Sequence, residues 1–251
     1  MGSIADSAGL HDRVVLITGA ARRVGAEIAR TLHAAGANIL IHYRSSSADA
    51  AALAASLNEA RSRSAALCDA HLTDPGAADR LVAATIAEFG RLDILINNAS
   101  SFYPTPVGGI TAAQWDDLMG SNLKAPLFLS QAAAPALRAQ RGSIINMVDI
   151  HALRPLKAHP VYCAAKAGLA MLTRALAREL GPEIRVNGVA PGPVLWPESH
   201  MDETLKQAII GKTALKRPGS PRDVARTVLF LSRDAPYITG QIIAVDGGRS
   251  I

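Results

Sequence analysis

Short, continuous apolar runs alternate with longer segments at helical spacing along nearly the whole chain. We expect strands at seven of these runs: 14–18, 38–43, 64–68, 92–96, 143–148, 184–189 and 241–245. The helical pattern falls between them, at about 24–35, 47–60, 75–89, 111–138, 160–180, 202–210 and 221–232. Because the strands are apolar on both faces, they suit a parallel sheet that helices cover on both sides. The sequence therefore predicts an α/β fold with a doubly wound parallel sheet.

The rest of the composition agrees with one compact domain over residues 1–251, since no repeat, linker or low-complexity tract divides the chain. No apolar run approaches the ~20 residues of a membrane helix. The first six residues lack the basic and apolar regions of a secretory signal. With two cysteines, a disulfide framework is not expected, so we predict a cytoplasmic protein without a membrane partner.

The formal net charge is +5, and the charged residues are dispersed along the chain. No basic stripe is interleaved with aromatic residues, so the sequence does not indicate nucleic-acid binding. Part of the excess positive charge is available to an anionic cofactor.

A glycine-containing turn, residues 18–25 (TGAARRVG), follows the first expected strand and opens the first helix. Such a turn presents backbone N–H groups and the positive end of a helix to an anion. Glycine also allows close approach because it has no Cβ. Two glycines six positions apart are not the usual dinucleotide fingerprint, and a tight turn without a ligand has the same pattern. The context therefore decides whether this turn holds a pyrophosphate.

The end of the second expected strand indicates the cofactor. An NAD-selective site needs a carboxylate about 20 residues past the glycine turn. Here residues 42–47 read HYRSSS, and the first acidic residue after this strand is Asp49. The guanidinium of Arg44 and the neighbouring serines suit a 2′-phosphate, which predicts NADPH. The alternative is a solvated arginine beside serines that cap the next helix. Arg22 and Arg23 are further candidate phosphate partners, or solvated cations at a helix start.

Tyr162 and Lys166 lie four residues apart on the expected helix 160–180, so both project from one face. The phenol of tyrosine has an ordinary pKa of about 10, and a nearby ammonium lowers it. We therefore expect Lys166 to lower the pKa of Tyr162 and to bind the nicotinamide ribose. The alternative is a tyrosine at the edge of the core beside a surface lysine.

These motifs together resemble the short-chain dehydrogenases/reductases. The order and spacing match at the glycine turn, Asn97-Asn98-Ala99, Asn122, Tyr162/Lys166, Pro191-Gly192, Tyr237-Ile238-Thr239-Gly240 and Val245-Asp246-Gly247-Gly248. The resemblance covers essentially the whole chain. It implies a Rossmann-type sheet of seven strands and hydride transfer from a nicotinamide, with the tyrosine as proton donor. It also implies that Lys166 orients the ribose and that Asn122 holds a water of the proton relay.

One position departs from the family pattern. Most members have a serine about 13 residues before the tyrosine, and this chain has Asp149. An ionised carboxylate cannot donate a hydrogen bond to a carbonyl oxygen, and it opposes the charge that develops on a reduced ketone. Two interpretations remain: loss of activity, or a substrate that is protonated at nitrogen. Alternatively, Asp149 caps a helix or forms a salt bridge in a loop.

A second departure favours the substrate protonated at nitrogen. Asn97-Asn98-Ala99 is followed by Ser100 rather than glycine, and then by Ser101-Phe102-Tyr103-Pro104. With the turn at 18–25, the segment 42–45 and the segment 145–149, this pattern resembles the pteridine reductases. That subfamily reduces pterins and folates with NADPH and holds the pteridine between nicotinamide and phenylalanine. By position, the phenylalanine is Phe102, for which the alternative is a loop aromatic at the sheet edge.

The resemblance implies a full set of site residues. The catalytic residues are Asp149, Tyr162, Lys166 and Asn122. The cofactor-binding residues are Gly19, Arg22, Arg23, Val24, Gly25, Tyr43, Arg44, Ser45, Ser46, Leu72, Asn98, Ala99, Ser100, Tyr162, Lys166, Pro191 and Gly192. The substrate-binding residues are Arg23, Ser100, Phe102, Asp149, Tyr162 and Trp196.

Some details remain open. The family's acid for the adenine amino group is replaced by His71, with Asp69 two residues earlier, so either residue or the backbone at Leu72 is a candidate. Trp196, in the segment 193–198, either walls the pterin pocket or packs locally. The nearby His151, His159 and Cys163 have no metal-ligand spacing, so no metal is expected.

We therefore expect an NADPH-dependent pteridine reductase acting on pterin or folate rings. The alternatives are a 3-oxoacyl (carbonyl) reductase of the same family, which Asp149 disfavours, and a non-catalytic NADP(H)-binding sensor or scaffold. Family members are commonly homotetramers, which implies an interface on the helices at 111–138 and 160–180.

Overall fold

A parallel sheet of seven strands forms the centre of the computed structural model, which describes residues 9–196 and 202–251. The strands are β1 (Val14–Ile17), β2 (Asn38–Tyr43), β3 (Ala65–Asp69), β4 (Ile94–Asn97), β5 (Ser143–Met147), β6 (Arg185–Pro191) and β7 (Ile242–Val245). Their order is β3-β2-β1-β4-β5-β6-β7, and every neighbouring pair is parallel. The strand order reverses between β1 and β4, so the predicted doubly wound sheet is confirmed.

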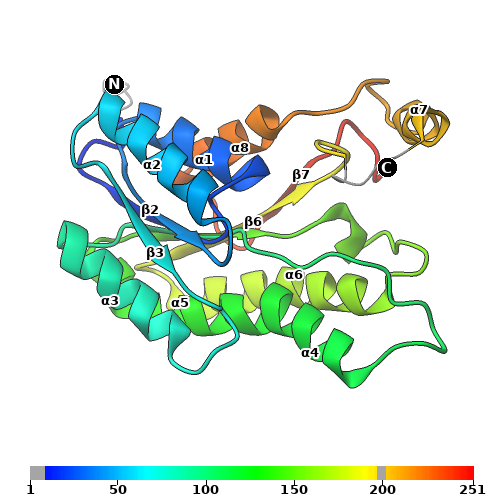
Figure 1. Cartoon of the computed structure of the whole chain (residues 1–251), viewed down its shortest axis with the longest axis horizontal. Coiled ribbons are helices and arrows are strands. Elements are labelled where there is room, and N and C mark those ends of the chain that lie inside the picture. Colours follow the sequence, from blue (N-terminus) through cyan, green and yellow to red (C-terminus); the bar gives the residue numbers. More distant parts are fainter. Residues whose placement is uncertain (1–8, 197–201) are drawn as a thin grey trace.

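Helices cover both faces of the sheet (Figure 1). On one face lie α1 (Arg23–Ala34), α2 (Ser47–Ala60) and α8 (Pro221–Arg233), and on the other lie α3 (Ala77–Phe89), α5 (Ala125–Ala139) and α6 (Pro160–Leu180). Alternate strand residues serve the two layers: Val15 and Ile17 belong to one core cluster, and Leu16 belongs to the other. Burial on both faces explains why the central strands β1 and β4 are mainly apolar.

The remaining helices lie towards one end of the sheet (Figure 1). These are α4 (Ala112–Met119) and α7 (Glu203–Gly211). In the described parts of the chain, no helix is long and apolar enough to cross a membrane.

The predicted continuous helix at 111–138 is wrong in one respect. A π-helical turn, η1 (Gly120–Lys124), separates α4 from α5. The side chain of Asn122 in this turn donates hydrogen bonds to the carbonyls of Leu118 and Ser101, both at 2.9 Å. Gly120 packs so closely against Thr73 that an added Cβ would lie 2.8 Å from the Thr73 Cγ2 atom. Tertiary contacts of this kind are invisible to helical periodicity, and π-turns are frequent at functional sites.

Candidate active site

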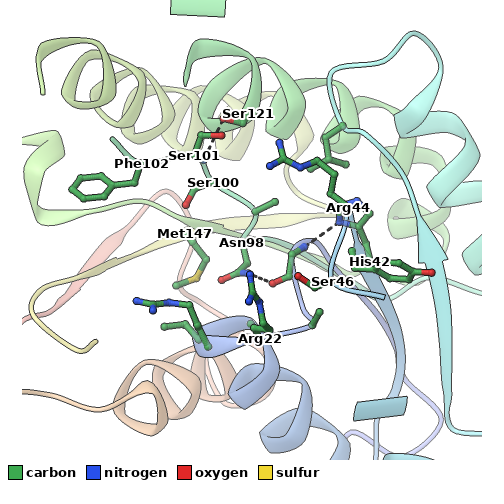
Figure 2. Close-up of a pocket in the computed structure, with 18 of the residues that line it drawn as sticks. Arg22, His42, Arg44, Ser46, Asn98, Ser100, Ser101, Phe102, Ser121 and Met147 are labelled. Carbon is green, nitrogen blue, oxygen red and sulfur yellow. Dashed lines mark hydrogen bonds between the residues drawn. The ribbon is translucent and has the colours of Figure 1, made fainter. Parts of the chain in front are cut away.

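A cavity of ≈ 730 Å³ opens at the carboxyl ends of the parallel strands, where doubly wound sheets bind ligands. Phe102 and Arg44 lie at opposite ends of it (Figure 2). The predicted site residues among its lining are Gly19, Arg22, Arg23, Val24, Gly25, Tyr43, Arg44, Ser45, Ser46, Leu72, Asn98, Ala99, Ser100, Phe102, Asp149, Tyr162, Lys166 and Pro191. The fold thus brings most of the predicted residues to one cavity.

The glycine turn is held against the segment that follows β4. Gly19 has a φ of +61°, and the Asn98 side-chain amide donates to the carbonyls of Thr18 and Gly19, at 2.8 and 3.0 Å. A Cβ added to Gly25 would lie 2.3 Å from the carbonyl oxygen of Gly19. Only glycine permits this approach of α1 to the turn. The cradle therefore fits the pyrophosphate of a dinucleotide, with the N-terminus of α1 beside it.

Arg23 occupies the first position of α1 with a φ of +56°, in the left-handed region that non-glycine residues rarely adopt. Its Nη2 atom donates to the carbonyl of Trp196 at 3.0 Å. The arginine therefore connects the glycine turn with the segment 193–198, which contains Trp196. Residues 197 and 198 of that segment lie outside the described residues.

The phosphate end of the cavity is lined by exposed polar side chains of the β2–α2 connection. Arg44 and Ser45 are exposed, and Ser46 is the N-cap residue of α2 but makes no side-chain capping hydrogen bond. The alternative in which Ser46 serves only to cap the helix is therefore not supported. Arg22 lies 3.8 Å from Asp49 across the same region, with both side chains about half exposed. Figure 2 shows Arg22 and Arg44 coming from different segments around the pocket.

Of the residues expected to recognise adenine, His71 and Leu72 line the cavity and Asp69 does not. The Nδ1 atom of His71 lies 2.7 Å from the Thr73 hydroxyl and 3.5 Å from a carboxylate oxygen of Asp74. Between the two side chains left open by the sequence, the geometry favours His71.

The side chains of Asp149 and Tyr162 form a direct hydrogen bond with each other. The Tyr162 hydroxyl donates to the Oδ2 atom of Asp149 at 2.7 Å, and the Oδ1 atom accepts from the backbone N–H of His151 at 2.8 Å. Asp149 is therefore both the cap of a short 3₁₀ turn (Ile150–Ala152) and the partner of the tyrosine. The Lys166 ammonium donates to the Met147 carbonyl at 2.8 Å and lies 5.6 Å from the centroid of the Tyr162 ring.

The expected lowering of the Tyr162 pKa is wrong. Burial, the negative charge of Asp149 and their hydrogen bond all raise the pKa of the Tyr162 phenol well above its usual value. Burial lowers the pKa of Lys166 to about 8, while the Asp149 carboxylate acts in the opposite direction. Burial is the largest cause of this difference, and the Asp149 carboxylate, which lies within hydrogen-bond distance of the phenol, adds to it. Tyr162 therefore remains a protonated phenol rather than a phenolate.

Three predicted residues do not line the cavity. Asn122 is fully buried behind it, and its Oδ1 atom has no hydrogen-bond partner among the described residues. Gly192 packs against β7, where an added Cβ would lie 2.6 Å from the Asp246 Cβ atom. Trp196 meets the site through its backbone carbonyl, which accepts from Arg23. These three residues are placed to support the walls of the cavity.

Phe102 lies in a group of rings at the other end of the cavity. Its ring is 50% exposed, stacks on His159 with centroids 4.8 Å apart and an interplanar angle of 12°, and meets Tyr162 edge-on at 4.8 Å. A half-exposed ring beside the acid Tyr162 offers a surface on which a flat heteroaromatic ring can stack.

Sequence reasoning missed several residues of the cavity wall. Asp117 and Ser121, from α4 and η1, line it together with Ser101. The Asp117 carboxylate accepts from the Tyr103 hydroxyl at 3.0 Å and from the Ser101 hydroxyl at 3.3 Å, which fixes the segment that carries Phe102. Their positions depend on how α4 crosses the sheet, and no local sequence signal predicts it. His42 was also missed, although it stands in the HYRSSS segment.

The fold and the site define a nicotinamide-dependent oxidoreductase with a doubly wound α/β domain. Residues 19–250 match the family model described as enoyl-(acyl carrier protein) reductase. The chain belongs to the short-chain dehydrogenase/reductase family, as its motifs predicted, and is an NADPH-dependent oxidoreductase.

Curated relatives cover nearly the whole chain. Pteridine reductase 1 of Leishmania tarentolae is 40% identical, over 95% of this chain and 96% of its own. The 3-oxoacyl-(acyl-carrier-protein) reductase FabG of Staphylococcus aureus is 34% identical, over 93% and 96% of the two chains. Among solved structures, a blue fluorescent protein from a metagenomic library, in complex with NADPH, matches with a TM-score of 0.90 and 35% identity, over 97% of this chain and 100% of that chain.

Proposed function

We propose that the protein is a pteridine reductase that uses NADPH to reduce C=N bonds of pterins, such as biopterin and dihydrobiopterin, with folate and dihydrofolate as further candidate substrates. The observation that carries the proposal is the bond of 2.7 Å between the Tyr162 hydroxyl and the Asp149 carboxylate, next to the half-exposed ring of Phe102. The 40% identity to a pteridine reductase supports it.

Each residue at the cavity has a different role in the proposed reaction. When bound, NADPH supplies the hydride. The Asp149 carboxylate accepts hydrogen bonds from the ring N–H and amino groups of a pterin, which a serine hydroxyl matches less well. Tyr162, whose proton is retained because its pKa is raised, donates that proton to the ring nitrogen. Lys166, anchored on the Met147 carbonyl, lies beneath the tyrosine and is placed to bind the ribose.

The runner-up activity is reduction of 3-oxoacyl groups, which two relatives at 34% identity support by their names. Asp149 opposes it, because its carboxylate lies where a donor to the carbonyl oxygen is needed. A non-catalytic NADP(H) sensor or scaffold is the alternative of another class, and the intact Tyr162–Lys166 pair counts against it.

A substrate comparison distinguishes these three functions. Purified protein is mixed with NADPH and, in parallel, with dihydrobiopterin, dihydrofolate or an acetoacetyl thioester, and cofactor oxidation is followed at about 340 nm, where reduced nicotinamide absorbs. We expect the largest kcat/KM with a pterin. Turnover of the thioester far above that of any pterin would establish the runner-up, and binding of NADPH without any turnover would establish the sensor.

Arg44 is expected to select NADPH over NADH. Replacing it with alanine should raise the Kd for NADPH about 10- to 100-fold, because one charge-assisted hydrogen bond to the 2′-phosphate contributes about 1.5–3 kcal/mol. The Kd for NADH should stay nearly constant. Titration of protein fluorescence measures both values, and Arg30→Ala, an exposed arginine of α1 away from the cavity, is the matched control. An equal loss of affinity for NADPH and NADH would show that Arg44 does not recognise the 2′-phosphate.

We also propose that residues 1–251 act as one NADP-binding domain and assemble into a cytoplasmic homotetramer. Exposed apolar side chains on the helices assigned to the interface support this assembly: Trp115 on α4, Phe128 on α5 and Met171 on α6. Light scattering after size exclusion measures the mass in solution. A monomer at micromolar concentration would rule out the assembly.

A further inference from the structure

The buried side chain of His42 forms part of the wall of the cofactor cavity and has no role in the proposed chemistry. The residue is in the last part of β2 and is 2% exposed. Its Nδ1 atom lies 3.0 Å from the backbone nitrogen of Gly19, and its Nε2 atom lies 3.1 Å from the carbonyl oxygen of Ala70. A backbone N–H only donates and a carbonyl only accepts, so the ring is neutral with its proton on Nε2.

These two hydrogen bonds connect three segments of the cofactor site. Gly19 belongs to the turn after β1, Ala70 follows β3, and both line the cavity. The backbone carbonyl of His42 also accepts from the N–H of Ala20 at 2.9 Å. The Gly19 N–H is thereby directed to the ring, which sets the orientation of the turn. One ring thus holds the pyrophosphate turn and the adenine-side loop in a fixed relation.

We infer that His42 is a positioning residue for NADPH: in its neutral Nε2–H form it fixes the glycine turn against the loop after β3, and a second proton on the ring weakens cofactor binding. This inference depends on the cofactor and not on the identity of the substrate. An added proton would go to Nδ1, where it would face the N–H of Gly19, donor against donor. The turn would then have to move or its amide would lose its partner.

The charges around the ring act in opposite directions. Burial lowers the pKa of His42, whereas the hydrogen bond to Ala70 and the carboxylate of Asp69 raise it. The other titratable side chains of the surrounding segments are Arg22 and Arg23 on the turn, Tyr43 and Arg44 after His42, Cys68 on β3 and His71 after β3. Since burial is the largest effect, the neutral ring predominates at neutral pH, and the imidazolium forms only in acid.

Two amide variants separate the two hydrogen bonds. In His42→Asn the Oδ1 atom replaces the acceptor Nδ1, whereas in His42→Gln the side-chain NH₂ replaces the donor Nε2. His42→Leu removes both. We expect His42→Leu to raise the Kd for NADPH about tenfold or more, and His42→Asn to raise it no more than about threefold, since the turn keeps its partner. His42→Gln should lie between them.

The matched control is His33, another buried histidine, whose Nε2 atom lies 2.7 Å from the Ser64 hydroxyl away from the cavity. His33→Asn should leave the Kd for NADPH within about twofold of the wild-type value, because it removes no contact of the cofactor site. The melting temperature of each variant shows whether it is folded. If His42→Leu does not fold, the order of the Asn and Gln variants still decides. Binding by His42→Asn as weak as by His42→Leu or His42→Gln would overturn the inference.

A pH profile supplies a second, independent readout. The Kd for NADP⁺, which is stable in acid, is measured between pH 5 and 8 for the wild type and His42→Asn. The 2′-phosphate titrates at about pH 6 with both proteins. The wild-type Kd divided by the His42→Asn Kd therefore reports the effect of the His42 ring alone. Because the neutral ring is the binding form and burial lowers the pKa of His42, we expect this ratio to rise only as the pH falls below the ordinary histidine value of about 6.5 and through the lowered pKa of His42. A ratio that is constant over the whole range would contradict the inference.

Discussion

Replacing Asp149 with serine is expected to lower the kcat/KM for dihydropterins at least about 100-fold, the lower range for loss of a positioned acid–base group. The substitution removes the carboxylate that accepts a hydrogen bond of 2.7 Å from the Tyr162 hydroxyl and that would accept hydrogen bonds from the pterin. The Kd for NADPH should change little, because among the described residues the Asp149 side chain otherwise accepts a hydrogen bond only from the His151 N–H. Cofactor oxidation with dihydrobiopterin measures the effect, and fluorescence titration measures the affinity for NADPH.

The Asp149→Asn variant keeps the shape of the side chain and removes its negative charge, so it tests the effect of the charge alone. The amide retains an acceptor oxygen for the N–H of His151, but it lacks the anion that distinguishes this site from a carbonyl reductase. We expect it to lose pterin turnover nearly as strongly as Asp149→Ser. For Asp149→Ser, the ratio of pterin to acetoacetyl-thioester turnover should fall, since a hydroxyl donates to a carbonyl oxygen. Pterin turnover by Asp149→Ser at the wild-type rate would mean that the carboxylate does not select the substrate.

Removing the Tyr162 hydroxyl should lower kcat for pterin reduction about 1000-fold, within the range expected when a general acid is lost. The Tyr162→Phe variant keeps the ring that contacts Phe102 and removes only the proton donor. KM and the Kd for NADPH should stay within about threefold of wild type, because the lost interaction belongs to the chemical step. Single-turnover measurements of cofactor oxidation distinguish this step from product release.

Tyr237→Phe is the matched control for this change. Tyr237 is fully exposed and lies outside the cavity, so the same loss of a hydroxyl there should leave turnover unaffected. If Tyr162→Phe reduced pterins as fast as the wild type, another group would be the proton donor. If neither the wild type nor Tyr162→Phe turned over any substrate, the chain would be a binding protein rather than a reductase.

The sequence predicted the fold because the information is local. The strands are mostly short apolar runs, and a parallel sheet buried on both faces is the arrangement that accommodates such runs. The location of the site followed from the same reasoning, since loops after strands meet at one edge of a doubly wound sheet. Gly19, Arg44, Phe102 and Asp149 were found in this way, and all of them line one cavity.

The interactions within the site could not be predicted in the same way. Tyr162 and Lys166 suggested a lowered pKa for the tyrosine, but burial of the phenol and the side chain of Asp149, from another segment, raise it. The π-turn at η1 and the burial of Asn122 depend on packing against the loop that holds Thr73. His42 reads as one more residue of a β-strand, and its bonds to Gly19 and Ala70 exist only once three strands are side by side. These features arise from tertiary contacts rather than from spacing along the chain.

A crystal structure of the protein with NADP⁺ and methotrexate is the most direct test of the pterin site. Our account predicts that the pteridine ring of methotrexate lies against the face of Phe102, between that ring and the nicotinamide, with its ring N–H and amino groups within hydrogen-bond distance of Asp149. A pteridine bound away from Phe102, with Asp149 still paired only to Tyr162 and His151, would contradict it.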